Sequence, residues 1–100
     1  MDMDALMEQA RDMQAKVAEA QEQLAKMFVK GIAGDGLVII ELDGKYNLKK
    51  LTLAPDLMKK SADDAMQVIS DAYMDAKAKV DSTIDRVMGA ATGGLDFPQE

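Results

Sequence analysis

Lysine side chains are the residues of this sequence whose type and spacing could do chemistry, and that chemistry is the binding of phosphate. Lys45, Lys49 and Lys50 lie in one short segment, and no acidic residue follows them within the next few positions. Ammonium groups placed in this way can neutralise phosphates and release counterions. The whole chain has 12 basic and 18 acidic residues and a net charge of −6, which repels phosphate at long range. The sequence therefore predicts a local basic surface on an acidic protein. These lysines could bind phosphate or could simply be solvated, and both interpretations stay open.

Motifs for catalysis and for cofactor binding are missing from the sequence. It has no histidine and no cysteine, which excludes His-based acid–base catalysis, cysteine nucleophiles and zinc sites of imidazole or thiolate. The glycines at 31–36 lead into an expected strand and match no GxxxxGK[ST] pattern. Asp63 and Asp64 stand at a helix start, where carboxylates simply favour the positive end of the dipole. We therefore expect no enzymatic activity, no metal or organic cofactor and no small-molecule substrate.

The N-terminus gives no sign of export. It opens Met1-Asp2-Met3-Asp4, which is acidic where a signal peptide is basic, and no long uncharged apolar run follows. The missing cysteines agree with a reducing compartment. These observations predict a cytoplasmic protein without a membrane partner.

Two apolar seams of helical period predict two long helices. The first is expected over residues 4–27, where no Gly or Pro interrupts steps of three and four residues. The second is expected to begin after Ser61, which forms a capping box with Asp64, and to end at Met88 before Gly89. The seam residues are Leu6, Ala10, Met13, Val17, Ala20, Leu24 and Met27 in the first helix and Met66, Ile69, Tyr73, Ala76, Val80, Thr83 and Val87 in the second.

Between the helices the apolar rhythm changes to that of strands. Asp43-Gly44 predicts a two-residue primed hairpin turn, and a shift of parity predicts a bulge near Lys49 and Lys50. The fold class is α+β, in the order αβββα, with two long helices flanking a three-stranded antiparallel meander. One domain is expected over residues 1–88 and a flexible C-terminal tail over 89–100. Three strands are expected, at residues 28–32, 37–43 and 45–53.

The middle strand is apolar on both of its faces. Val38, Ile40 and Leu42 alternate with Ile39 and Glu41. Two helices on one side of a three-stranded sheet bury only one face. A second copy of the chain is the simplest cover for the other face, so the sequence predicts a homodimer joined through the sheet. The predicted interface residues are Leu37, Val38, Ile39, Ile40 and Leu42.

Several short motifs, taken in order, resemble those of one family. They are Gln9, Met13-Gln14 with Lys16, QEQL at 21–24, GDGLV at 34–38, Asp43-Gly44-Lys45 and LTLAP at 51–55. Their order and spacing are similar to those of the YbaB/EbfC family of bacterial nucleoid-associated proteins over nearly the whole chain. The resemblance implies a homodimer whose meanders join and whose helical arms project. It also implies binding of double-stranded DNA, with little sequence preference, in the nucleoid.

Charge and the family resemblance together give the expected DNA-binding residues. Lys16 lies within a family-like motif, and Lys16, Lys26 and Lys79 each follow an acid by four residues, where an ion pair is the simpler interpretation. Aspartates share the second helix with its basic residues, so weak and salt-dependent binding is expected. The alternative is a non-DNA interaction protein, a dimer that holds clients between its arms in a prefoldin-like role. The expected DNA-binding residues are Arg11, Lys16, Lys26, Lys45, Lys49, Lys50, Lys77, Lys79 and Arg86.

Overall fold

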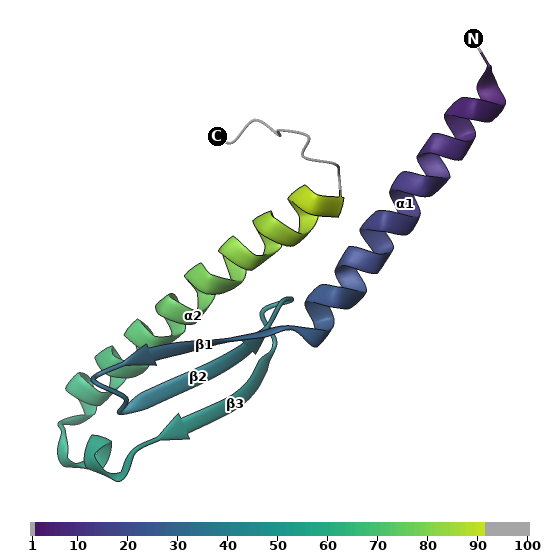
Figure 1. Cartoon of the computed structure of the whole chain (residues 1–100). Helices are drawn as coiled ribbons and strands as arrows, with labels where there is room; N and C mark the ends of the chain where they lie inside the picture. The colour runs from purple at the N-terminus through teal and green to yellow at the C-terminus, as the bar shows by residue number, and fades with distance from the viewer. Residues whose placement is uncertain (1, 92–100) are drawn as a thin grey trace.

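The chain folds as a long helix, a three-stranded sheet and a second long helix (Figure 1). The structure is a computed structural model and describes residues 2–91. The order αβββα expected from the sequence is confirmed. The elements are α1 (Met3–Lys26), β1 (Phe28–Ala33), β2 (Val38–Asp43), β3 (Leu48–Leu53), the short 3₁₀ helix η1 (Pro55–Lys59) and α2 (Ala62–Ala91).

The sheet is antiparallel, with β2 in the middle and β1 and β3 as its edges. Gly31 of β1 pairs with Ile40 of β2, and Ile40 pairs with Leu51 of β3. Residues in direct register point to the same face of a sheet. These three positions therefore define one face, which is the face toward α2.

The pairing of β2 with β3 contains the predicted β-bulge. Glu41 pairs with Lys50 and the next residue, Leu42, pairs with Leu48. Lys49 therefore has no partner on β2, which is the irregularity expected from the shift of parity.

The β2–β3 turn is not the primed two-residue turn expected at Asp43-Gly44. The Tyr46 N–H donates to the Asp43 carbonyl oxygen at 3.2 Å, and the Asp43 N–H donates to the Asn47 carbonyl oxygen at 2.9 Å. These two bonds close a three-residue loop in which Tyr46 takes the left-handed conformation, at φ 65°. The third strand consequently begins at Leu48, later than expected.

Contacts with both helices determine the form of this turn. A Cβ on Gly44 would lie 2.4 Å from the Leu24 carbonyl oxygen. The Gly44 N–H donates to that oxygen at 2.9 Å and to the Met27 carbonyl oxygen at 3.1 Å, so the turn satisfies the C-terminal end of α1. The Tyr46 hydroxyl donates to the Asp81 carboxylate of α2. This hydrogen bond raises the pKa of Tyr46 above its ordinary value.

The core lies between α2 and the first two strands. Val38, Ile40 and Leu42 point toward α2 and are 0, 4 and 1% exposed, which confirms their predicted alternation. A Cβ on Gly31 would lie 2.1 Å from the Ala72 carbonyl oxygen, so only glycine lets β1 approach α2 this closely. The helix contributes small and branched side chains to the same core, namely Ala72, Ala76 and Val80.

The first helix does not cover the sheet, although two covering helices were expected. It continues the long direction of the molecule (Figure 1), and near its C-terminus Ala20 and Leu24 pack with Val87 of α2. Nearer the N-terminus its seam is open, with Leu6 47% and Met13 39% exposed. The radius of gyration is 18.9 Å, against about 13 Å for a compact domain of this length. One chain therefore leaves much of its apolar surface uncovered.

Side chains cap the start of both helices. The Asp2 carboxylate accepts a hydrogen bond from the Asp4 N–H at 3.1 Å. The Ser61 hydroxyl oxygen accepts one from the Asp64 N–H at 3.2 Å, as the capping box predicted.

None of the helices within residues 2–91 is long and apolar enough to cross a membrane.

The second helix continues past its expected end. It passes through Gly89 and ends at Ala91 rather than at Met88. Glycine inside a helix costs about 1 kcal/mol, but Met88 and Ala91 pack against the cluster of α1 and α2 side chains, which offsets that cost. Residues 92–100 of the expected tail lie outside the described residues.

Candidate nucleic-acid interface

An open groove lies between β1 and α2. Its volume is about 560 Å³, and its lining comes from residues 27–32 on one side and 79–86 on the other. Three of the lining residues are basic, Lys30, Lys79 and Arg86, and none of those that the structure describes is acidic. The whole chain carries a net charge of −6, so this positive lining differs from the average surface of the protein. The local positive charge favours an anionic ligand. We call this feature the β1 groove.

Lys79 holds the free edge of β1 together with Asp75. Its ammonium donates to the Lys30 carbonyl oxygen at 2.7 Å and lies 3.0 Å from the Asp75 carboxylate. The same carboxylate accepts a hydrogen bond from the Ile32 N–H at 3.0 Å. The hydrogen bonds from Ile32 and Lys79 lower the pKa of Asp75. The charge of Lys79 is therefore already engaged in fixing the strand.

Lys30 and Arg86 carry the charge of the groove that remains available. Within residues 2–91 neither the Lys30 ammonium nor the Arg86 guanidinium takes part in an ion pair, and both residues are exposed. Arg86 follows Lys79 by seven residues, about two helical turns, so both stand on the same side of α2. The β1 groove thus offers two cations that a phosphate can reach.

A second basic area, next to a buried carboxylate, consists of Lys45 in the β2–β3 turn and of Lys49 and Lys50 in β3. Asp43 is 2% exposed and accepts hydrogen bonds from the Lys45 N–H at 2.7 Å and from the backbone and side-chain amides of Asn47, both at 3.0 Å. Burial would raise the pKa of Asp43, but these hydrogen bonds and the charge of Lys49 outweigh it and lower that pKa. The Lys49 ammonium lies 3.7 Å from the carboxylate. Lys45 and Lys50 are exposed.

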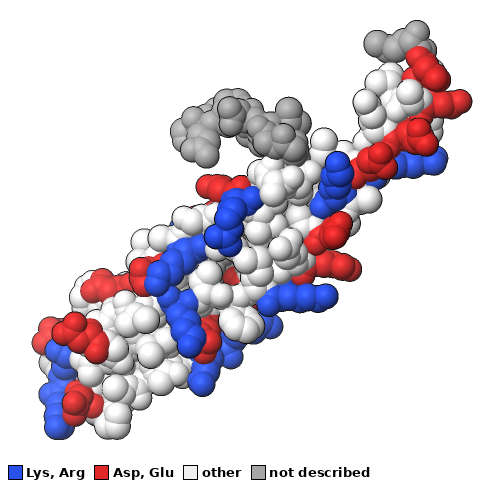
Figure 2. Space-filling view, in the orientation of Figure 1, with Lys and Arg blue, Asp and Glu red and all other residues white. Residues whose placement is uncertain are grey.

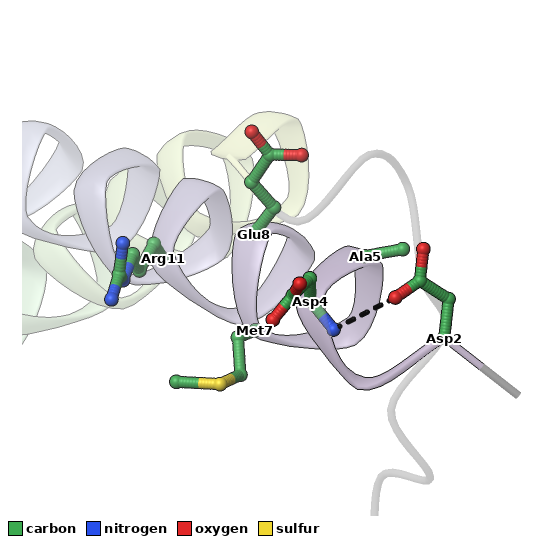
Figure 3. A pocket seen from close by; sticks show the side chains of 6 residues that line it. All are labelled: Asp2, Asp4, Ala5, Met7, Glu8 and Arg11. Atoms are coloured by element: carbon green, nitrogen blue, oxygen red, sulfur yellow. Dashed lines mark hydrogen bonds between the residues drawn. The ribbon is translucent and has the colours of Figure 1, made fainter.

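The tip of α1 is acidic rather than basic. Asp2, Asp4 and Glu8 line a hollow together with Arg11 (Figure 3). Figure 2 shows acidic side chains gathered at this end and basic side chains following one another over the middle of the same face, across α2. Carboxylates around Arg11 oppose the approach of phosphate.

The remaining predicted residues stand apart from these groups. Lys16 lines another groove, with Glu19, between α1 and the end of α2. Lys26 lies in the last turn of α1 and Lys77 on α2, and both are exposed. The structure therefore brings Lys79 and Arg86 together and places Lys45, Lys49 and Lys50 in a second area, but it does not gather all nine residues into one site. Their roles in DNA binding stay predictions.

Most of the residues predicted for a dimer interface are used within one chain. Val38, Ile40 and Leu42 belong to the core under α2 and Leu37 packs against it, which leaves Ile39 half-buried on the opposite face. Apolar surface is exposed elsewhere on the sheet, on β3. Its exposed side chains on the α2 face are Leu48, Leu51 and Leu53, at 59, 46 and 37%.

Sequence reasoning passed over two residues of the β1 groove. Lys30 and Phe28 are two positions apart in a strand and therefore point to the same face, which the sequence could have shown. Phe28 is 66% exposed. That Arg86 lies across from them depends on the packing of α2 on β1, which no local pattern reveals.

Fold and charge together define a class, the αβββα proteins with an exposed basic groove, and the comparisons place the chain in a DNA-binding family of that fold. Residues 1–95 match the YbaB/EbfC DNA-binding family, and the chain belongs to this family. The resemblance stated from its motifs is therefore confirmed. The family is one of DNA-binding proteins and not of enzymes.

Individual relatives agree with this assignment. A nucleoid-associated protein of Gluconobacter oxydans is 44% identical over 94 residues, which are 93% of this chain and 88% of that protein. One of Rhodospirillum rubrum is 36% identical with the same coverage. The crystal structure of an uncharacterized protein from Helicobacter pylori has a TM-score of 0.80 at 20% identity and covers 93% of this chain and 99% of that one. This last likeness shows the fold.

Proposed function

We propose that the chain binds double-stranded DNA as a homodimer, with little sequence preference, in the nucleoid of a bacterial cytoplasm. The observation that carries the proposal is the β1 groove, where basic residues line an open surface without an acidic neighbour in the lining. Membership of a DNA-binding family gives the anionic ligand its identity, and the relatives are named nucleoid-associated proteins.

Phosphate contacts dominate the proposed mechanism. Lys30 and Arg86 neutralise phosphates and release counterions, which gives affinity without reading the bases. The hydroxyl of Thr83, also in the lining, already donates to the Lys79 carbonyl oxygen at 2.8 Å, so it does not serve as a base-reading donor. The proposed low sequence preference follows because contacts to phosphate carry no sequence information.

The surface proposed for the second copy is the uncovered part of the α2 face of the sheet. α2 covers β1 and β2, and the leucines of β3 on the same face stay partly exposed within residues 2–91. Leu51 lies directly beside the buried Ile40 in the register. A second copy placed over β3 extends this core and removes apolar surface from water at about 25 cal/mol per Å². Sedimentation of the native chain at micromolar concentration tests this part of the proposal.

A salt titration tests the DNA part. Binding to a fluorescent duplex is measured for the native chain, for the double variant Lys30→Ala with Arg86→Ala, and for the control Lys59→Ala with Lys60→Ala, which removes the same charge at η1. Loss of two phosphate contacts flattens the slope of log K against log salt by about 1.8. The control keeps the native slope. An unchanged slope in the groove variant moves the DNA site away from the β1 groove, and no binding at low salt refutes the proposed function.

Exposed apolar side chains on α1 favour a second candidate function. Met3, Leu6 and Met7 are 72, 47 and 51% exposed on a helix that projects from the rest of the molecule. Flexible apolar side chains of this kind accept varied partners, as the client-holding alternative requires. Suppressed aggregation of an unfolding test protein, together with no retention on duplex DNA, favours this second function over the first.

A further inference from the structure

Phe28 is an aromatic residue whose side chain is exposed to solvent. It is 66% exposed, more than Tyr46 at 39% or Tyr73 at 42%, the other aromatic residues within residues 2–91. It is the first residue of β1 and lines the β1 groove. A strand backbone anchored by Asp75 and Lys79 holds it in place. The ring is therefore presented on a rigid element beside the groove.

The charges around this ring select the kind of ligand it meets. Lys30 follows on the same face of the strand, Arg86 lies in the same groove, and the described lining contains no carboxylate. An apolar protein surface gains nothing from these cations, and a small anion has no use for the phenyl group. Duplex DNA offers both phosphates for the cations and stacked bases for the ring.

We propose that Phe28 acts as a wedge. The ring enters the minor groove at a base step of a duplex held through its phosphates by Lys30 and Arg86, and the duplex is kinked as that step unstacks. Apolar side chains inserted in this way bend DNA by tens of degrees. This inference rests on the proposed DNA binding and adds to it a defined deformation of the ligand.

The experiment measures bending separately from affinity. A duplex of thirty base pairs carries a donor and an acceptor fluorophore at its two ends, and a matching duplex carries 2-aminopurine to detect unstacking. The full-length chain is compared with Phe28→Ala, with Phe28→Leu, which keeps an apolar wedge, and with Met58→Ala. Met58 is 71% exposed on η1 and gives a matched loss of apolar surface. Circular dichroism checks that every variant folds.

We expect the native chain, the Phe28→Leu variant and the Met58→Ala control to increase energy transfer and 2-aminopurine emission at saturation. Phe28→Ala binds the duplex with an unchanged salt slope and a Kd raised by less than about tenfold, because lost contacts and avoided unstacking offset each other. It shows no rise in energy transfer.

Three outcomes contradict the wedge. Native chain that binds duplex without a change in energy transfer overturns it, and so does a Phe28→Ala variant that bends DNA as the native chain does. A Phe28→Ala variant weakened only toward single-stranded DNA assigns the ring to base stacking on single strands instead. Native chain that fails to bind duplex at low salt refutes the proposed function itself, before any bending is measured.

Discussion

The two edge strands of the sheet differ in how far the rest of the chain completes them. The outer backbone groups of β1 bond to Asp75 and Lys79, and α2 covers one face of the strand. All six residues of β3 are exposed, and its three leucines on the α2 face are 37 to 59% exposed. One chain therefore completes the β1 edge and leaves the β3 edge open, which is where the proposed second copy would bind. This difference also places the proposed DNA groove and the proposed dimer surface at opposite edges, so that each can be altered alone.

Replacing Gly31 by Ala should have the largest effect, because it breaks the completed edge. The new Cβ would lie 2.1 Å from the Ala72 carbonyl oxygen and 2.5 Å from the Ala76 nitrogen, so α2 must move away from β1. We expect a loss of more than about 3 kcal/mol in the free energy of unfolding, measured with urea. A Cβ on Gly89 meets nothing within 4 Å, so Gly89→Ala should stabilise by up to about 1 kcal/mol. Native stability in Gly31→Ala contradicts the close packing.

The register pair of Ile40 on the middle strand and Leu51 on the open edge compares the covered and the exposed parts of the α2 face. Ile40 is 4% exposed and Leu51 46%. Ile40→Ala should lower the free energy of unfolding by about 3 kcal/mol at any protein concentration. Leu51→Asp should leave the chain folded but weaken self-association, which sedimentation at several concentrations detects. Equal assembly of native chain and Leu51→Asp would remove β3 from the interface.

The dependence of stability on pH tests how much Asp43 stabilises the turn between β2 and β3. Its pKa is lowered from 3.8 in the folded chain, so its contribution to stability is present above that value. The contribution is lost as pH falls through the folded pKa. Asp43→Asn should destabilise the chain by about 1 to 2 kcal/mol at neutral pH, and the difference from native should shrink below pH 3.8. Urea unfolding from pH 7 to pH 2.5 measures this. A difference that stays constant over the range contradicts the assignment.

The smallest expected effects separate the two lysines of the β1 edge. Lys79→Ala removes the hydrogen bond to the Lys30 carbonyl and should lower the free energy of unfolding by about 1 kcal/mol. It should leave the salt slope of DNA binding unchanged, since its charge is already paired. Lys30→Ala should leave stability within about 0.5 kcal/mol and flatten the slope by about 0.9. Urea unfolding and salt titrations of both variants measure these effects. A flattened slope in Lys79→Ala, or a loss of stability in Lys30→Ala, would contradict the assignment.

Periodicity made the order of the elements predictable from the sequence. The unbroken seams of both helices, the alternation of Val38, Ile40 and Leu42, and the parity shift at Lys49 are local patterns that the fold preserves. The family was predictable from short motifs whose spacing the loops keep. These features depend on residues close together along the chain.

Tertiary contacts decided the features that the sequence did not show. The Asp43-Gly44 pair suggested a primed turn, but the approach of Leu24 requires glycine at position 44 for space rather than for its φ. The seam of α1 does not reveal that only its last turns meet α2. In the same way the β1 groove joins residues 27–32 to residues 79–86, and no local rule pairs them.

The bonds from α2 to β1 have a consequence for the size of the assembly. Asp75 and Lys79 are four residues apart, a rise of about 6 Å along a helix. The Lys30 carbonyl and the Ile32 N–H that they bind are two residues apart, about 6.6 Å along a strand. This near-equality lets α2 serve as a substitute fourth strand, presenting an acceptor and a donor at the spacing of a real neighbour. Within residues 2–91 the edge left open is β3, and the proposed second copy, placed over the β3 leucines, would also shield that edge, so the assembly ends in a pair instead of a fibre.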